Sequence, residues 1–275
     1  MFELFSLPGS GPILKGYHWP KEDPVGVILL IHGVGEHAGR YDMPASWMQE
    51  RNFSVISMDL PGHGNSPGPR GHAAPRTVIL QKIDDLITLA SARYPDKPLF
   101  LYGHSMGGNI ALDHRKRGLQ RTSLCGYVIS APWLELVHPP STSMVLAARI
   151  LSRLLPGLGI RTGNDPGQMS RQQVEVNRYE RDPLIHGKIS AQTAVDCTDA
   201  ALRLLAGPDD SNSPVLLMHG TGDTICSMEG SKKVCAMAGT KGTLILWDGS
   251  YHEIHHEENG KDVIQTALDW MEQLI

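Results

Sequence analysis

Apolar and polar positions along the chain follow two alternating patterns. Continuous apolar runs, typical of strands buried on both faces of a parallel sheet, occupy residues 25–31, 54–60, 98–102, 125–131, 214–218 and 243–247. Segments with the spacing of amphipathic helices lie at residues 41–51, 77–94, 108–117, 228–237 and 261–274. Strand-like residues 2–7 and 13–19, joined by a link rich in Pro and Gly, predict an N-terminal hairpin. The pattern therefore predicts an α/β fold with a mainly parallel, doubly wound sheet.

One stretch, residues 133–190, interrupts this alternation. It contains no strand candidate, and its clearest element is an amphipathic helix at residues 143–155. Because it directly follows the end of a predicted strand, we expect it to lie over the carboxyl edge of the sheet. We interpret it as a helical cap on a core formed by residues 1–132 and 191–275; an ordinary packing excursion is the alternative.

Composition narrows the function classes. The chain has 275 residues, is 41% apolar and carries a formal net charge of −4, which argues against a nucleic-acid partner. Its four cysteines show no zinc-binding spacing and are expected to be reduced thiols of a cytoplasmic protein. We predict no metal and no cofactor. The N-terminal residues lack the pattern of a secretory signal, and the longest apolar run is too short to span a bilayer.

The motif with the clearest chemistry is Gly103-His104-Ser105-Met106-Gly107, which reads G-x-S-x-G. A strand-like run precedes it and a helix-like segment follows, as in a nucleophile elbow. Such an elbow exposes the serine hydroxyl at the strand end, and a β-carbon at Gly103 or Gly107 would crowd the neighbouring strand and helix. A chance match on a Gly-rich turn is the alternative. We therefore predict Ser105 as the nucleophile.

An acid and a base are expected after the serine, in that order along the chain. Asp223 follows the predicted strand 214–218, and His252 follows the strand 243–247, so both belong at the same sheet edge as Ser105. We predict His252 as the base and Asp223 as its orienting acid; Asp182 and Asp248 are weaker candidates.

The oxyanion donors are predicted by position. His32-Gly33-Val34-Gly35 follows the first core strand, and Met106 follows the serine, so the backbone amides of Val34 and Met106 are the expected donors. We expect His32 to be a structural loop residue.

Together these motifs resemble the monoacylglycerol lipase and lysophospholipase branch of the α/β-hydrolases. The resemblance covers almost the whole chain, the cap included, and is carried by His32-Gly-Val-Gly-Glu-His37, Gly39-Arg40-Tyr41, Asp59-Leu-Pro-Gly-His-Gly64, Gly103-His-Ser-Met-Gly-Gly108, Ser130-Ala-Pro132, Ser170-Arg171, Glu175-Val176, Tyr179, Asp182-Pro-Leu184, Gly222-Asp223, Tyr251-His252, His255 and Glu257. It implies an α/β-hydrolase fold, and a serine hydrolase that cleaves glycerol monoesters of fatty acids without a cofactor. Mammalian members carry alanine at the Val34 position, where only the backbone amide is needed.

The resemblance also implies further site residues. It places Glu36, Arg40, Tyr179 and His255 around the glycerol pocket, although Glu36 and Arg40 could instead pair on a loop. It further implies that Cys226 confers sensitivity to thiol reagents without taking part in catalysis.

Several alternatives remain open at this level. A lysophospholipase or a broad carboxylesterase shares the same chemistry and differs only at the polar end of the pocket. A non-catalytic receptor of this fold would be expected to lack a triad residue, and none is missing. A dehalogenase needs Asp where Ser105 stands, a C–C hydrolase lacks support from the cap, and nothing in the sequence recognises the free N-terminus of a peptide.

An apolar cap with a narrow polar end suits one acyl chain and one small head group, and its outer side is a candidate for transient contact with membranes or micelles. The oligomeric state is left open.

Overall fold

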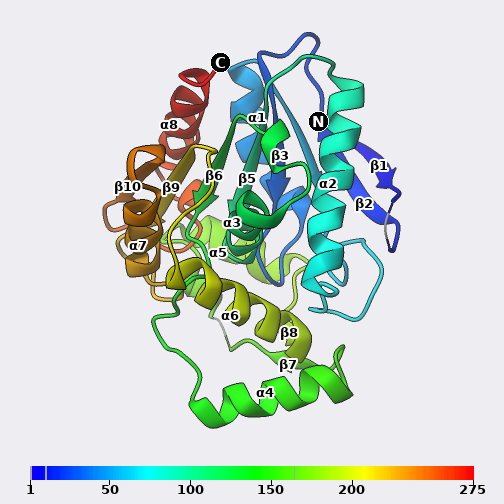
Figure 1. The fold of residues 1–275 in the computed structure, drawn as a ribbon, viewed down its shortest axis with the longest axis vertical. Helices are drawn as coiled ribbons and strands as arrows, with labels where there is room; N and C mark the ends of the chain where they lie inside the picture. Colours follow the sequence, from blue (N-terminus) through cyan, green and yellow to red (C-terminus); the bar gives the residue numbers. More distant parts are fainter. Residues whose placement is uncertain (1, 10, 164) are drawn as a thin grey trace.

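An eight-stranded sheet forms the centre of the computed structural model, which describes residues 2–9, 11–163 and 165–275 (Figure 1). Its strands are β1 (Glu3–Leu7), β2 (Leu14–Trp19), β3 (Gly26–Ile31), β4 (Phe53–Met58), β5 (Leu99–His104), β6 (Gly126–Ser130), β9 (Val215–Gly220) and β10 (Gly242–Trp247). They lie in the order β1-β2-β4-β3-β5-β6-β9-β10. The hairpin β1–β2 and the pair β2–β4 are antiparallel, and every pair from β4 to β10 is parallel. The N-terminal hairpin and the mainly parallel sheet are thus confirmed.

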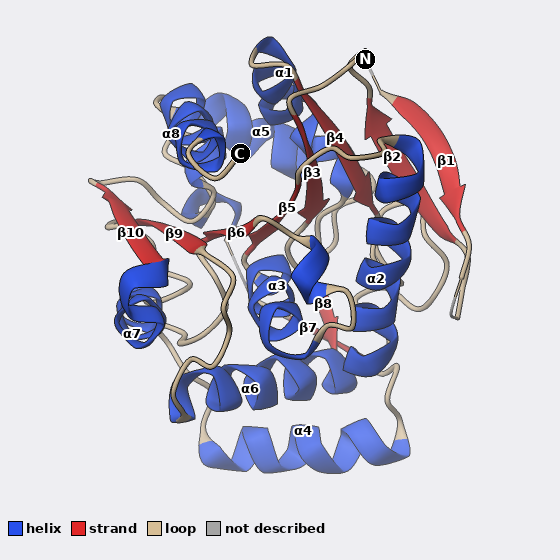
Figure 2. Ribbon diagram, turned by 45° about the horizontal axis from the view of Figure 1, so that its top comes forward, coloured by secondary structure: helices blue, strands red, loops and turns tan. Residues whose placement is uncertain are grey.

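Helices cover both faces of this sheet (Figure 2). They are α1 (Asp42–Glu50), α2 (Arg76–Arg93), α3 (Met106–Arg117), α6 (Ala191–Ala206), α7 (Met228–Ala238) and α8 (Gly260–Glu272). Helices α1 and α8 share an apolar cluster with one face, and α2, α3, α6 and α7 with the other. Strand β3 contributes side chains to both clusters, since Leu29 belongs to one and Leu30 to the other. Burial on both faces explains its continuous apolar run.

Residues 133–190 lie beyond the sheet at one end of the molecule (Figure 1). They contain α4 (Thr142–Leu154), β7 (Gly159–Arg161), α5 (Gln173–Arg181) and β8 (Lys188–Ser190). Helix α4 confirms the predicted helix, and it packs on α6. The expectation of no strand here was wrong, because β7 and β8 form an antiparallel pair. Three-residue strands are too short to show a period, and helices α5 and α6 were not predicted either.

Short 3₁₀ turns join several of these elements. They are η1 (Ala38–Tyr41), η2 (Arg121–Ser123), η3 (Pro166–Gln168), η4 (Gly239–Lys241) and η5 (Ile254–His256). Strands β5, β6, β9 and β10 are neighbours and run parallel, so the loops after them meet at one edge of the sheet. In a parallel sheet this carboxyl edge is where ligands bind.

Candidate active site

Ser105 occupies a strained turn between β5 and α3. Its backbone has φ 53° and ψ −114°, in a region that side-chain-bearing residues rarely adopt. A β-carbon on Gly103 would lie 2.4 Å from the Gly107 carbonyl oxygen, and one on Gly107 would lie 2.1 Å from the Ile31 carbonyl oxygen. The two glycines are therefore required for helix α3 to approach β3 and β5 so closely, which is the reason predicted from the sequence.

The structure brings Ser105, His252 and Asp223 into one hydrogen-bonded row. The Ser105 hydroxyl lies 3.0 Å from His252 Nε2, and His252 Nδ1 lies 2.7 Å from Asp223 Oδ2. Burial would lower the pKa of His252, but the Asp223 carboxylate beside it outweighs burial and raises that pKa above its usual value. The row has the geometry of a nucleophile, a base and an orienting acid.

Asp223 is held by more partners than the sequence indicated. Its Oδ1 accepts from the backbone amides of Ile225, at 2.8 Å, and Cys226, at 3.0 Å. The buried ring of His219 approaches Oδ2 with Nε2 at 3.2 Å. Burial would raise the pKa of Asp223, but His252 and His219 hold it well below its usual range. The acid is therefore ionised and fixed in orientation.

The loop 32–36 lies directly against the serine. A β-carbon built on Gly33 would lie 3.2 Å from the Ser105 β-carbon. Val34 follows in this loop and lines cavities that also contain Ser105, and Met106 begins α3 immediately after the serine. Both residues stand beside Ser105, as an oxyanion hole would require. His32 is fully buried and its Nε2 accepts from the Leu60 amide at 2.9 Å, which fits a structural role.

A small polar recess adjoins Ser105 on one side. Its volume is about 20 Å³, and its walls include Glu36, Met169, Tyr179 and Glu253. Arg40 lies behind this wall, paired with Glu36 at 2.8 Å and with both oxygens of Glu253 at 2.5 and 2.8 Å. Its guanidinium also stacks over the Tyr179 ring at 4.9 Å. Glu253 was not predicted, because a single glutamate in a loop gives no signal of burial.

His255 is not part of that wall. Its side chain is fully buried, stacks on Tyr41 with ring centroids 4.9 Å apart, and neither ring nitrogen has a hydrogen-bond partner among the described residues. The structure therefore places Glu36 and Tyr179 at the recess, and Arg40 and His255 behind it.

An apolar cavity of about 310 Å³ adjoins Ser105 on the other side. Its walls come from residues 133–190, from α6 and from the loop after β9, and include Trp133, Met144, Val145, Ile160, Ile189, Val195 and Ile225. Cys226 also lines it, and burial, with the nearby Asp223 charge, raises the pKa of its thiol well above the usual value. The volume lies at the lower end of the range for small-molecule sites.

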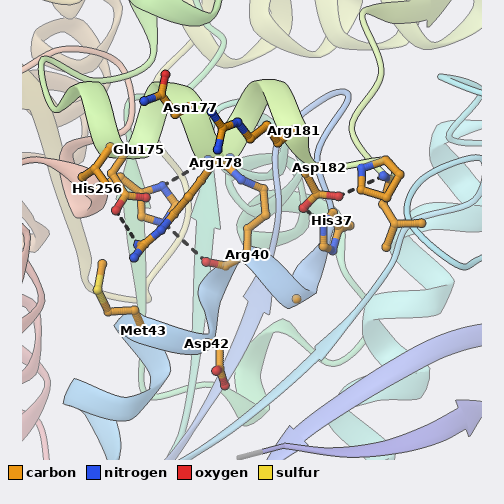
Figure 3. Close-up of a pocket in the computed structure, with 14 residues that line it drawn as sticks. His37, Arg40, Asp42, Met43, Glu175, Asn177, Arg178, Arg181, Asp182 and His256 are labelled. Carbon is orange, nitrogen blue, oxygen red and sulfur yellow. Dashed lines mark hydrogen bonds and ion pairs between the residues drawn. The ribbon is translucent and has the colours of Figure 1, made fainter.

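A larger hollow of about 870 Å³ lies outside the recess, between α5 and the loop and helix around Arg40 (Figure 3). Arg40 and His256 line it, whereas Ser105 does not. Asp182 lies here, 2.9 Å from His37 Nε2, and is not part of the row formed by Ser105, His252 and Asp223. Asp248, the other weak candidate for the acid, accepts from the Thr221 hydroxyl at 3.2 Å at the surface.

Two further findings concern the described part of the chain. No group of three His, Cys, Asp or Glu side chains among these residues could hold a metal ion. No helix within the same residues is both long and apolar enough to cross a membrane.

Comparison with known proteins adds independent information. The family model described as "Serine aminopeptidase, S33" (Hydrolase_4) matches residues 22–259. Monoglyceride lipase of Rattus norvegicus is 31% identical over 273 residues, which cover 97% of this chain and 89% of the relative. The structure of a monoacylglycerol lipase from Paleococcus ferrophilus is 32% identical, with a TM-score of 0.87, and the match covers 95% of this chain and 99% of that one. An uncharacterized abhydrolase domain-containing protein of Dictyostelium discoideum is 31% identical over 258 residues; the match covers 93% of this chain and 27% of the relative's length.

Proposed function

We propose that this chain cleaves the ester bond of monoacylglycerols. It belongs to the family described as "Serine aminopeptidase, S33", and it is similar to monoglyceride lipases over almost its whole length. The observation that carries this proposal is the position of Ser105 between an apolar cavity of about 310 Å³ and a polar recess of about 20 Å³. One acyl chain fits the first, and the ester's alcohol faces the second. The products are glycerol and a free fatty acid.

The chemistry proceeds through an acyl-enzyme intermediate. The Ser105 hydroxyl attacks the ester carbonyl while His252 Nε2 accepts its proton, as their 3.0 Å separation supports. The backbone amides of Val34 and Met106 stabilise the tetrahedral oxyanion, and Asp223 stabilises the imidazolium. His252 then donates its proton to the departing glycerol oxygen. Water, activated by the same histidine, hydrolyses the acyl-enzyme and releases the fatty acid.

Tyr179 is the candidate contact for the glycerol hydroxyls. It lines the recess, and its hydroxyl makes no hydrogen bond with any residue that the structure describes, so it is free to meet an alcohol. A recess of about 20 Å³ holds roughly one water molecule, so glycerol requires the α5 segment or the Met169 side chain to move outward. Further acyl chains on the glycerol would require a much larger displacement than glycerol alone, which favours monoacylglycerols over di- and triacylglycerols.

The same recess distinguishes this proposal from peptidase and lysophospholipase activities. An aminopeptidase needs an unpaired carboxylate for a substrate amine, but Glu36 and Glu253 are both paired with Arg40. A phosphocholine head group is larger than glycerol and would require a greater displacement of α5. A lysophospholipid is therefore the second substrate class to test.

Contact with a lipid surface is part of the proposal. Helix α4 exposes Met144, Leu146, Ile150 and Leu154, each more than half accessible to solvent. Residues 136–164 contain three arginines and no aspartate or glutamate, although the whole chain is acidic; Arg149 is paired with Asp199 of α6, which leaves Arg153 and Arg161 as the flanking basic residues. An apolar helix face flanked by basic residues suits transient binding to micelles or membranes, where such substrates dissolve.

The experiment is a hydrolysis panel with the wild type and Ser105→Ala. We expect monoacylglycerol to be cleaved faster than lysophosphatidylcholine, diacylglycerol and triacylglycerol in the same dispersion. Ser105→Ala should lose roughly four or more orders of magnitude in turnover and all labelling by a fluorophosphonate probe. Equal rates on mono- and triacylglycerols would refute the closed recess. Labelling that persists in Ser105→Ala would refute the assignment of the nucleophile.

A further inference from the structure

The Glu36 carboxylate accepts hydrogen bonds from three groups inside the protein. Its side chain is buried, and its Oε1 accepts from the Gly33 amide at 2.6 Å and from the Tyr41 hydroxyl at 2.9 Å. Its Oε2 accepts from Arg40 Nη1 at 2.8 Å. Three donors, one of them a guanidinium, bind the two oxygens, so this carboxylate is strongly held.

The contact with Gly33 fixes the loop that carries Val34. On one side of Gly33, its amide is held by Glu36; on the other side, its carbonyl oxygen accepts from His32 Nδ1 at 2.7 Å. Burial lowers the pKa of His32 to about 3, so this ring is neutral and donates only through Nδ1. The Gly33 carbonyl and the Val34 N–H belong to one planar trans peptide group and point in opposite directions. Holding Gly33 at both ends therefore sets the direction of the Val34 N–H.

We propose that Glu36 is a positioning residue for the oxyanion hole, and that it does not bind the leaving alcohol. This inference rests on the proposed serine hydrolase chemistry, but it holds for any ester whose carbonyl is attacked by Ser105. An alcohol that donated a hydrogen bond to Glu36 Oε1 would compete with the Gly33 amide or the Tyr41 hydroxyl, both buried. Leaving a buried donor unpaired is costly, so that exchange is unfavourable.

The variants Glu36→Ala and Glu36→Gln separate the two roles. Alanine removes every acceptor from the Gly33 amide, whereas glutamine keeps one neutral carbonyl oxygen for it. In both variants Arg40 remains paired with Glu253, so no buried cation is left alone. Asp113→Asn is the matched control, because Asp113 is also buried and ion-paired, with Arg117 at 2.6 Å, but lies near the far end of α3 from Ser105.

Each variant is assayed on a monoacylglycerol and on a nitrophenyl ester of the same fatty acid. We expect Glu36→Ala to lower kcat on both esters by the same factor, roughly 10- to 1,000-fold, with KM little changed, because an oxyanion donor is misdirected. Affinity for a trifluoromethyl ketone with that acyl chain should fall in parallel, since its tetrahedral adduct occupies the same hole. Glu36→Gln should recover part of both losses, and Asp113→Asn should behave as the wild type.

Three results would overturn the proposal. The first is a loss confined to the glycerol ester, which would make Glu36 an alcohol contact. The second is an unchanged kcat and ketone affinity per active site titrated with fluorophosphonate, together with a lowered melting temperature, which would make it only structural. The third is wild-type behaviour of Glu36→Ala throughout. Because the nitrophenyl ester and the ketone contain no glycerol, they test Glu36 even if monoacylglycerol proves not to be the substrate.

Discussion

Replacing Arg40 with methionine tests how much stability depends on one buried cation. Arg40 is 7% exposed and lies between two carboxylates, Glu36 and Glu253, each 3% exposed. Methionine has a similar length and no charge, so the change leaves two buried anions without their counter-ion. Burial would raise the pKa of Glu253, but Arg40 and His256 hold it well below its usual range. That balance is lost in the variant.

The expected magnitude follows from this geometry. Removing one partner of a buried ion pair costs about 3–5 kcal/mol of unfolding free energy. At about 2–4 °C per kcal/mol for a domain of this size, the melting temperature should fall by roughly 6–20 °C. Arg51→Met is the matched control. Arg51 also bridges two carboxylates, on Asp269 and Glu272, but its side chain is 33% exposed and theirs are 60% and 37% exposed. Exposed pairs of this kind contribute about 0–1 kcal/mol.

Unfolding by urea at two pH values supplies the assay. In the wild type the pKa of Glu253 is depressed, so its stabilising contribution is complete at neutral pH and is lost only as pH falls through that lowered value. In Arg40→Met, burial opposes the charge of Glu253 without the guanidinium and raises the pKa of that carboxyl, so the penalty is largest near pH 8 and shrinks as Glu253 takes up a proton. The gap between wild type and variant should therefore be smaller at pH 5 than at pH 8. A gap that is equal at both values, or no larger than that of Arg51→Met, would refute the reasoning.

Three further predictions concern the catalytic turn and its surroundings. The acidic limb of the pH profile of kcat/KM should report a pKa above 6.5, because the Asp223 charge raises the pKa of His252 and only the neutral ring is a base. In Asp223→Asn, activity should fall by about 10,000-fold, and the acidic limb of the remaining activity should move to lower pH. Cys226→Ala should retain turnover and lose sensitivity to maleimide, and labelling of the wild type should be slow because burial raises the thiol pKa; inactivation of Cys226→Ala by maleimide would contradict this. Gly107→Ala should abolish probe labelling of the serine, since its β-carbon would lie 2.1 Å from a carbonyl oxygen at the end of β3, whereas Gly207→Ala, with open space around the new methyl, should label normally.

The hydrogen-bonded row of Ser105, His252 and Asp223 could be located from the sequence because a simple rule connects its members to the fold. The carboxyl ends of neighbouring parallel strands meet at one edge, so residues directly after β5, β9 and β10 must lie together. Ser105, Asp223 and His252 each stand in such a position, although they are far apart in the chain. The strands could be predicted from their apolar runs for a second reason: burial on both faces leaves no polar position in a strand such as β3.

The remainder of the site depends on pairings that no local pattern encodes. Arg40 and Glu253 are 213 positions apart, and each alone looks like a solvated loop residue. His255 matches a family motif, but its burial behind Tyr41 follows from packing that only the fold reveals. Strands β7 and β8 pair over three residues each, which is too short for a two-residue period to appear.

The direct pairing of β6 with β9 has a consequence for how such an enzyme can diversify. These strands are adjacent and parallel, with Tyr127 opposite Val215, so helix α6 alone would suffice as the crossover between them. Residues 133–190 are additional to what the sheet needs, yet Trp133, Met144 and Ile189 supply walls of the apolar cavity. Exchanging this segment between relatives would therefore create chimaeras that keep the same bond-breaking residues and select different acyl groups. Most of the cavity lining and the row Ser105, His252 and Asp223 lie in different stretches of the chain, so we expect the substrate range to change without a change in the chemistry.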